Sequence, residues 1–252
     1  MKENKRTVLF LVLGSFFIAN AIIAEFIGVK IFSLEKTLGI TPVDWKVFGN
    51  TLSFNMTAGV LLWPVVFVMT DIINEYFGRS GVKLFSYIAA TLVAYAFLAI
   101  YFGMALVPAD FWVSKQTPSG PLDMQNAYTQ IFGQGLWIII GSLVAFLVGQ
   151  IIDVAVFHSL KKRTGEKYLW LRSTGSTVVS QFIDSFVVLI IAFYIGAGWD
   201  LKLVLGIGVV NYLYKLTVAI LLTPVLYGVH ALIDTYLGRE LAESMMREAE
   251  TN

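Results

Sequence analysis

The stretch TVLFLVLGSFFIANAIIAEFIGVKIFSL, residues 7–34, decides the class of this protein, because Glu25 and Lys30 are its only charged residues. A helix needs about 20 mainly apolar residues to cross the roughly 30 Å hydrocarbon layer of a membrane. Further stretches of this kind occupy residues 58–77, 82–107, 134–160, 176–198 and 203–232. We therefore expect an all-α membrane protein with six transmembrane helices, forming a single polytopic domain over residues 1–252.

The composition excludes several functional classes. Hydrophobic residues make up 57% of the chain and charged residues 14%, against about 25% charged residues in a typical soluble domain. The absence of cysteine excludes disulfides and cysteine-ligated zinc, and His158 and His230 lack partners at ligand spacing, so we expect no metal site. With 18 basic against 17 acidic residues there is no basic surplus for nucleic acid. No glycine-rich lysine loop for nucleotide phosphates is present, so we expect neither ATPase activity nor a cofactor.

The distribution of lysine and arginine predicts the orientation in the membrane. Given six spans, 12 of the 18 basic residues fall at the N-terminus, in the loops after the second and fourth spans and in the tail, and 4 fall on the other side. Cytoplasmic loops retain the excess of positive residues, so we expect both termini, including the tail at residues 233–252, in the cytoplasm. The start of the chain, with Ala19-Asn20-Ala21, resembles a signal peptide. Because the apolar run continues to Leu34, we expect a retained span instead.

Two longer loops are expected on the external side. Residues 43–56 alternate apolar and polar side chains around Gly49-Asn50, a pattern typical of a small β-hairpin; a simple covering loop is the alternative. The second loop, Pro108 to Gly133, is too long for a mere connection. Loops of this length are usually functional or disordered, and this one has the aromatic content of an amphipathic lid.

Polar residues inside the spans are the candidates for a functional site. An ionisable side chain in the hydrocarbon layer costs a few kcal/mol or more, so such residues face the bundle interior and usually mark a pathway or a site. The candidate binding residues are Asp71, Asn74, Glu75, Gln150, Asp153, Gln181 and Asp184. Candidates for a supporting role, nearer the middle or the outer half, are Asn20, Glu25, Asn211 and Lys215.

Three of these carboxylates are expected to share one layer. With a rise of about 1.5 Å per residue, Asp71, Asp153 and Asp184 lie roughly 9, 10 and 12 Å from the cytoplasmic ends of their spans. This depth places them together in the inner half of the membrane. Among the other charged residues, we expect Lys215 to neutralise Glu25 or Asp184, while Glu75 lies close enough to the inner interface to be solvated instead of buried.

A Gln-x-x-Asp motif occurs twice, in Gln150-Ile151-Ile152-Asp153 and in Gln181-Phe182-Ile183-Asp184. An amide and a carboxylate three positions apart share one helix face. Together they offer a donor and acceptors that suit the edge of a guanine-like base, whose N–H groups require a carboxylate and whose carbonyl requires an amide N–H. The alternative is that these groups bond to one another and hold the helices together.

An intramembrane enzyme is a second class to consider, because Asp153 and Asp184 are expected on adjacent helices at one depth. Intramembrane aspartyl proteases use a Gly-x-Gly-Asp motif, whereas Asp184 follows Ser-Gln-Phe-Ile. A channel would show a repeated filter or a pore ring, and none is visible. Uptake of a small polar solute explains more of the interior polar residues, so we expect a transporter and not an enzyme.

The chain resembles the queuosine precursor transporter family, also called the vitamin uptake transporter family. The most specific motifs are Thr70-Asp71-Ile72-Ile73-Asn74-Glu75-Tyr76-Phe77-Gly78 in the second span and the segment from Leu169-Trp170-Leu171-Arg172 to Ser180-Gln181-Phe182-Ile183-Asp184. The resemblance covers essentially the whole chain. Two mild departures are Ser173, where members often have Asn, and Ser185, where Thr is usual.

The resemblance implies import of 7-deazaguanine bases, such as 7-cyano-7-deazaguanine and 7-aminomethyl-7-deazaguanine, across a bacterial inner membrane. It also implies a six-helix fold similar to the substrate-binding subunits of energy-coupling factor vitamin transporters. The chain could therefore be such a subunit, dependent on an ATP-driven module, although its first span lacks the paired alanines four apart through which those subunits dock. We expect the base and the lipid bilayer as partners and leave a homodimer open. Arg172 is expected to hold the fourth and fifth spans together.

Overall fold

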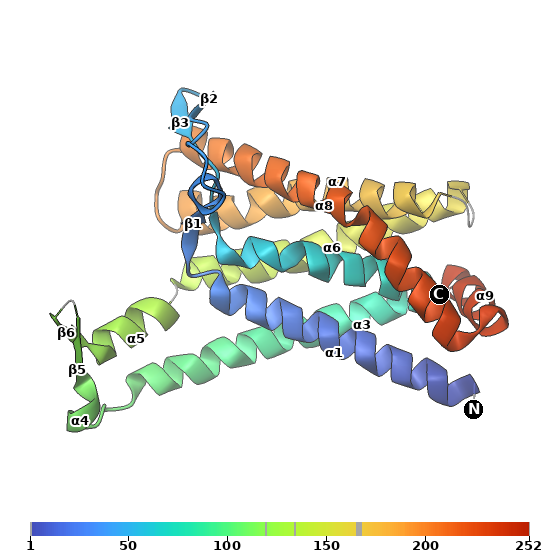
Figure 1. Ribbon diagram of the computed structural model, residues 1–252, viewed down its shortest axis with the longest axis horizontal. Helices are drawn as coiled ribbons and strands as arrows, with labels where there is room; N and C mark the ends of the chain where they lie inside the picture. Colours follow the sequence, from blue (N-terminus) through green and yellow to red (C-terminus); the bar gives the residue numbers. More distant parts are fainter. Residues whose placement is uncertain (1, 119, 134, 165–167, 252) are drawn as a thin grey trace.

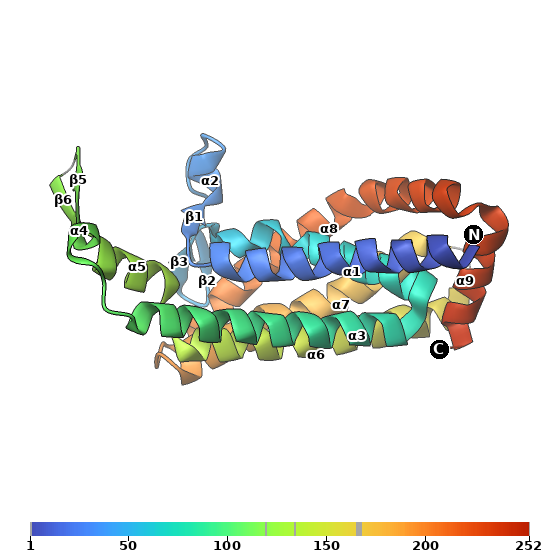
Figure 2. The ribbon, with the colours of Figure 1, turned by 90° about the horizontal axis from the view of Figure 1, so that it is seen from below.

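Long helices lying side by side form the body of the protein (Figures 1 and 2). The computed structural model describes residues 2–118, 120–133, 135–164 and 168–251. The long helices are α1 (Lys2–Ile27), α3 (Trp63–Ala105), α6 (Leu136–Thr164), α7 (Leu169–Leu189) with its π-helical continuation η2 (Ile190–Ile195), and α8 (Leu201–Leu237). Within the described residues, five helical stretches are long and apolar enough to cross a membrane. The protein is thus an all-α, multi-pass membrane protein.

Helix α3 contains a sharp reversal at Gly78. This residue has φ 68° and ψ −169°, a combination that is essentially restricted to glycine. The ribbon of α3 runs along the bundle, reverses and runs back (Figure 1), and the break in its helical geometry is at Gly78. The two apolar stretches expected at 58–77 and 82–107 are therefore the two arms of one broken helix.

Short strands and helices gather at one end of the bundle, which we call the strand end (Figure 1). In chain order they are β1 (Ile31–Ser33), α2 (Leu34–Thr37), β2 (Trp45–Val47), β3 (Asn50–Leu52), β4 (Asn55–Thr57) and the 3₁₀ helix η1 (Ala58–Leu61). Strands β2 and β3 pair antiparallel, with Val47 opposite Asn50. Met56 lies outside that hairpin, because β4 pairs with β1 and places Met56 opposite Phe32. The first helix accordingly ends at Ile27, before the position that its apolar run suggested.

The long loop after α3 forms an arm that projects from the strand end (Figures 1 and 2). It consists of α4 (Asp110–Val113), the antiparallel pair β5 (Ser114–Thr117) and β6 (Gly120–Asp123), and α5 (Met124–Phe132). The rings of Trp112 and Tyr128 pack edge to face, with centroids 6.1 Å apart. The arm thus has secondary structure of its own, and α5 leads directly toward the start of α6.

Both termini lie at the opposite end of the bundle, which we call the terminal end (Figure 1). The tail forms α9 (Arg239–Thr251), which packs against α3. Ala242, Met245 and Ala249 are its buried apolar residues. Arg6 of α1 forms an ion pair with Glu248 at 2.6 Å, so α9 contacts the N-terminal helix as well as α3.

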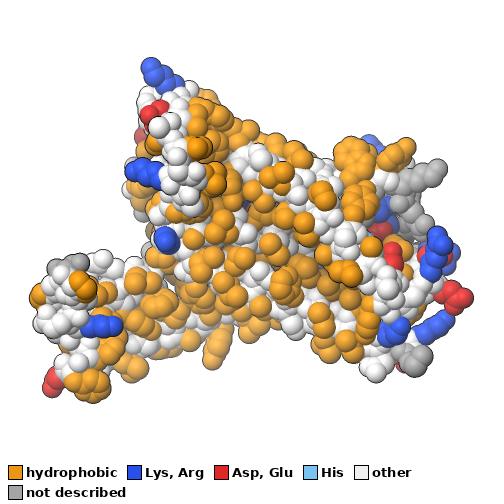
Figure 3. All heavy atoms as spheres, in the orientation of Figure 1, with side chains coloured by type: hydrophobic (Ala, Val, Ile, Leu, Met, Phe, Trp, Pro, Cys, Tyr) orange, Lys and Arg blue, Asp and Glu red, His pale blue; other side chains and the backbone are white. Residues whose placement is uncertain are grey.

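Apolar side chains occupy both the interior and the outer surface. Buried core residues come from α1, α3, α6, α8 and α9, including Phe17, Val66, Ile72, Phe146, Leu226 and Met245. Large apolar side chains are also exposed on the outer helix faces, such as Leu11, Phe16, Leu98 and Leu221. In Figure 3 hydrophobic atoms cover the middle of the visible face, and charged side chains gather toward the ends. This distribution is the one expected of a protein surrounded by lipid.

Candidate functional site

A wide cavity of about 400 Å³ lies inside the strand end of the bundle. Its wall is built by α1, α3, α6, α7, η2 and α8, by β1, β4 and η1 of the strand end, and by Gln130 of the arm. The polar and charged side chains that line it are Glu25, Thr57, Gln130, Ser142, Asp184, Ser185, Asn211 and Lys215. Trp63 and Phe193 contribute aromatic surface. Enclosed, mainly apolar cavities with a few convergent polar groups are the usual form of small-molecule sites.

The charged side chains of this cavity contact polar partners from other helices. Lys215 Nζ lies 2.5 Å from Asp184 Oδ2, which confirms the expectation that Lys215 neutralises a carboxylate and selects Asp184 as its partner. Glu25 accepts a hydrogen bond from the hydroxyl of Ser142. Acidic and basic groups from α1, α7 and α8 thus line the same cavity.

Asp184 does not share a layer with Asp153, contrary to the expected depth. Helix α7 begins at Leu169 and not near Ser176, so at about 1.5 Å per residue Asp184 lies roughly 10 Å further from the α6–α7 connection than expected. It faces Gly149, where an added Cβ would lie 3.6 Å from Asp184 Cβ. Asp184 therefore belongs to the wide cavity, one helical turn away from Asp153.

Asp71 of α3 and Asp153 of α6 form a second polar group, deeper in the bundle. Their exposed fractions are 1% and 0%. Asp71 accepts hydrogen bonds from Ser173 and, at 3.4 Å, from Ser176, and Asp153 accepts one from Ser180 at 2.9 Å. All three serines lie on α7, so hydroxyl groups of one helix hold both carboxyl groups.

The two glutamines lie in different surroundings. Gln150 Oε1 accepts a hydrogen bond from Thr70 at 3.0 Å, which ties α6 to α3. Gln181 is 3% exposed, and neither its Oε1 nor its Nε2 has a hydrogen-bond partner among the described residues. Gln181 lines a small cavity of about 10 Å³, together with Asp71 and Lys215. The two Gln-x-x-Asp motifs thus differ in their contacts: the amide of Gln150 joins two helices, whereas Gln181 lines a small cavity.

Two further candidates do not line the wide cavity. Asn20 is 8% exposed and donates to Phe16 O of its own helix at 2.8 Å. Asn74 is 3% exposed, and its Nδ2 has no hydrogen-bond partner in the described part of the chain.

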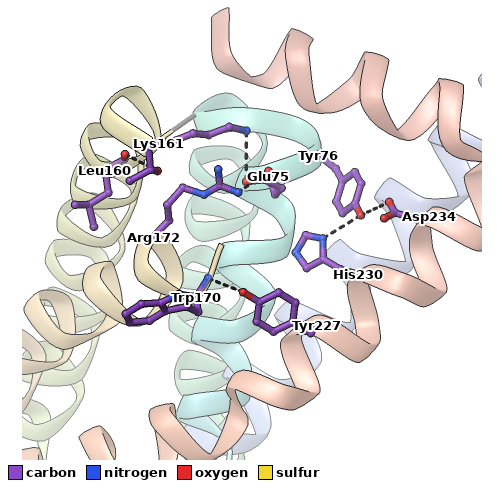
Figure 4. A network of polar contacts seen from close by, with 10 residues as sticks. Glu75, Tyr76, Leu160, Lys161, Trp170, Arg172, Tyr227, His230 and Asp234 are labelled. Atoms are coloured by element: carbon purple, nitrogen blue, oxygen red, sulfur yellow. Dashed lines mark hydrogen bonds and ion pairs between the residues drawn. The ribbon is translucent and has the colours of Figure 1, made fainter. Parts of the chain in front are cut away.

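Glu75 is buried, so the expectation that it is solvated is wrong. Its exposed fraction is 2%, and it forms ion pairs with Arg172 at 3.0 Å and Lys161 at 3.4 Å. Figure 4 shows both cations reaching Glu75 from α6 and α7. Arg172 thus joins α7 to α3, and Lys161 joins α6 to α3 through the same carboxylate. Lys161 and Arg172, which the sequence placed in the loop after the fourth span, are therefore buried in the bundle.

A neighbouring set of contacts joins α3 to α8 (Figure 4). Tyr76 Oη donates to Asp234 Oδ1 at 2.7 Å and lies 3.0 Å from His230 Nδ1. The hydroxyl of Tyr227 accepts a hydrogen bond from Trp170 N at 3.2 Å. Together with the Glu75 ion pairs, these contacts connect α3, α6, α7 and α8 toward the terminal end.

Sequence reasoning missed the serines that bind the interior carboxyl groups. Ser173, Ser176 and Ser180 follow one another at spacings of three and four residues, which places their hydroxyl groups on one face of α7. That spacing could have predicted a row of hydroxyl groups facing the bundle interior. No sequence pattern predicts the contact of Ser142 with Glu25, because it joins distant parts of the chain.

The described residues contain no group of three or more His, Cys, Asp or Glu side chains able to hold a metal ion. Carboxylate, amide, hydroxyl and ammonium groups line the wide cavity. Such a set binds an uncharged or weakly charged polar molecule through hydrogen bonds.

The sequence is similar to those of known membrane transporters. The sequence model of a family described as "putative vitamin uptake transporter" matches residues 57–229. A "probable queuosine precursor transporter" of Bacillus subtilis (strain 168) is 30% identical over 75% of this chain and 76% of that protein. One of Haemophilus influenzae with the same name is 28% identical over 90% of this chain and 88% of its own length.

The queuosine precursor transporter of Escherichia coli (strain K12) is 26% identical over 78% of this chain and 83% of that protein. No solved structure matches. The family match covers more than half of the chain and includes the segments that carry Asp71, Asp153, Asp184 and Lys215. The chain belongs to the vitamin uptake transporter family.

Proposed function

We propose that this protein imports queuosine precursors, 7-deazaguanine bases such as 7-cyano-7-deazaguanine and 7-aminomethyl-7-deazaguanine, across a bacterial inner membrane. The observation that carries the proposal is the wide cavity, which has Glu25, Asp184, Asn211 and Lys215 in its lining. Its volume of about 400 Å³ lies within the range of about 300–1,000 Å³ that is usual for small-molecule sites.

The chemistry of the cavity suits the edge of a guanine-like base. Two N–H donors on that edge require a carboxylate, which Glu25 or Asp184 supplies, and the carbonyl oxygen requires a donor, which Lys215 or Asn211 supplies. Trp63 offers an aromatic face for the ring. Of the seven binding residues expected from the sequence, Asp184 alone lines this cavity among the described residues, joined by three of the expected supporting residues.

The proposed topology has six crossings with both termini in the cytoplasm. The crossings are α1, the two arms of α3, α6, α7 with η2, and α8. The wide cavity then faces the outside, because it lies at the strand end and the termini lie at the other (Figure 1). The Glu75 ion pairs and the Tyr76 contacts lie between the cavity and the cytoplasm. The arrangement corresponds to a transporter that is closed on its inner side.

The experiment is restoration of queuosine in tRNA. A host that cannot make the base receives this gene alone, and growth medium supplies the base. We expect queuosine to reappear, to be lost with Asp184→Asn, and to be retained with Asp200→Asn. Asp200 is an exposed N-cap of α8, and asparagine caps a helix as well as aspartate does. No restoration by the wild-type chain, despite normal expression in the membrane, would contradict the proposal.

The rival function is a binding subunit of an energy-coupling factor transporter. It predicts failure of the single gene in a host without the ATP-driven module and success once the module is added. Restoration in a host that lacks this module favours a transporter that works alone.

A further inference from the structure

The carboxyl groups of Asp71 and Asp153 are buried without a cation. In the described part of the chain neither forms an ion pair within 4.0 Å. Their hydrogen bonds come from the hydroxyls of Ser173, Ser176 and Ser180. Hydroxyl groups stabilise a carboxylate less than a cation does, so this site differs from the Asp184–Lys215 pair.

The two carboxyl groups are held by neighbouring turns of α7. Ser173 and Ser176 donate to Asp71, and Ser180, one turn beyond Ser176, donates to Asp153. Asp153 Oδ2 has no hydrogen-bond partner among the described residues. Two ionised carboxylates in one buried site are strongly disfavoured, because each loses its hydration and each repels the other. One proton placed between them removes this penalty.

The remaining charged groups of the interior do not supply a counter-ion to this pair. Arg172 and Lys161 contact Glu75, one turn away on α3, and Lys215 contacts Asp184. The helices of the bundle carry these further interior titratable or charged side chains: Glu25 on α1, Glu75 and Tyr76 on α3, His158 and Lys161 on α6, Arg172 and Asp184 on α7, and Lys215, His230 and Asp234 on α8. The nearest of these to Asp71 along its own helix is an acid, which adds to the repulsion.

The wide cavity and a small cavity beside Asp71 have Lys215 in common. Asp71 lines the small cavity, whose volume is about 10 Å³. That volume is on the order of a single water molecule. The side chain of Gln181, buried and without a hydrogen-bond partner among the described residues, lines the small cavity as well. A water there can bond to the amide of Gln181 and to Asp71, which forms a chain for proton transfer.

We propose that Asp71 and Asp153 form a proton-binding site in which the two carboxyl groups share one proton, and that this site couples transport to the proton gradient. The proton passes from water of the wide cavity through the small cavity to a carboxylate oxygen, which becomes a carboxylic acid. It leaves to water at the terminal end once the Glu75 ion pairs separate, so no other reactant is consumed. The coupling rests on the proposed transport of a base, whereas the proton site itself does not.

The proton site is tested by infrared spectroscopy on the purified full-length protein in lipid. We expect the wild type to show the carbonyl band of a buried carboxylic acid at neutral pH, shifted by deuterium exchange. Asp71→Asn and Asp153→Asn should each alter the band and the double variant should lose it, while Asp110→Asn, an exposed position on α4, should keep it. Absence of the band from the wild type, or its persistence in the double variant, would overturn the proposal. The wild-type spectrum decides the matter even where a variant does not fold.

Coupling is tested in proteoliposomes that contain a pH-sensitive dye and receive 7-cyano-7-deazaguanine. We expect uptake of the base to acidify the interior and an imposed proton gradient to drive accumulation of about tenfold per pH unit for one proton per base. Uptake without acidification, or uptake driven by a sodium gradient instead, overturns the coupling and leaves the proposed function intact. If no base enters under any gradient, the proposed function fails, and the infrared result still decides the proton site.

Discussion

At the residue scale, the ion pair between Asp184 and Lys215 gives the first prediction. The side chains are 14% and 7% exposed, and removing one member of a buried pair leaves the other charge uncompensated, at a cost of about 3–5 kcal/mol. Asp184→Asn and Lys215→Met should therefore each lower the melting temperature of the ligand-free protein in detergent. The double variant should melt above both single variants. Additive losses in the double variant would show that the two side chains do not stabilise each other.

A substitution of Gln150 distinguishes an amide that binds substrate from one that joins helices. It accepts a hydrogen bond from Thr70 and lines neither the wide nor the small cavity. Gln150→Ala should thus reduce stability by about 1–3 kcal/mol, the cost of leaving a buried polar group unpaired, with little change in the Kd for a deazaguanine base. Thermal melting and equilibrium binding measure the two effects. A weakened Kd with an unchanged melting temperature would restore the direct contact expected from the sequence.

At the scale of the element, the reversal in α3 depends on Gly78. Its φ of 68° and ψ of −169° lie in a region that costs a residue with a side chain about 1–3 kcal/mol. Gly78→Ala should lower the melting temperature and the yield of monodisperse protein. Gly228→Ala is the matched control, because an added Cβ there meets nothing within 4 Å and alanine favours a helix by about 0.5–1 kcal/mol. Equal behaviour of both variants would show that α3 tolerates a different turn.

The attachment of α9 should depend on pH. The hydrogen bond from Arg6, together with its positive charge, lowers the pKa of Glu248 below the ordinary glutamate value. A lowered pKa in the folded state stabilises at neutral pH, and this contribution disappears as the pH falls through the lowered pKa. Because both side chains are well exposed, the effect is small and weakened by salt. A spin label at Arg247→Cys should become more mobile at acid pH, and Glu248→Gln should remove most of this dependence.

At the scale of the whole molecule, the orientation is open to direct test because the chain has no cysteine. Lys46 on β2 and Glu240 on α9 are exposed at opposite ends of the bundle. With both termini in the cytoplasm, a membrane-impermeant maleimide should label Lys46→Cys in intact cells and Glu240→Cys only after permeabilisation. The reverse pattern would turn the wide cavity toward the cytoplasm and make the protein a candidate exporter.

Much of the fold followed from local sequence. The apolar stretches predicted the long helices, and the two arms of α3 correspond to two of these stretches. The polar residues inside them were recognisable as interior residues, because a charge in hydrocarbon is costly wherever its partner lies. Glu25, Asp184, Asn211 and Lys215, which line the wide cavity, were among them. The boundaries were less accurate, since α7 begins at Leu169 inside a segment that reads as a polar loop.

By itself, the sequence determined that the chain resides in a membrane and marked the carboxylates and amides of its apolar stretches, Glu75 excepted, as interior side chains, because hydropathy and helical hydrogen bonding are local properties. Only the tertiary structure decided how those side chains combine: Asp184 with Lys215, Asp71 and Asp153 with three serines, and Glu75 with Arg172 and Lys161. These pairings depend on the register between distant helices. A shift of one helical turn, roughly 5.4 Å, moves a carboxylate from one polar group to the next.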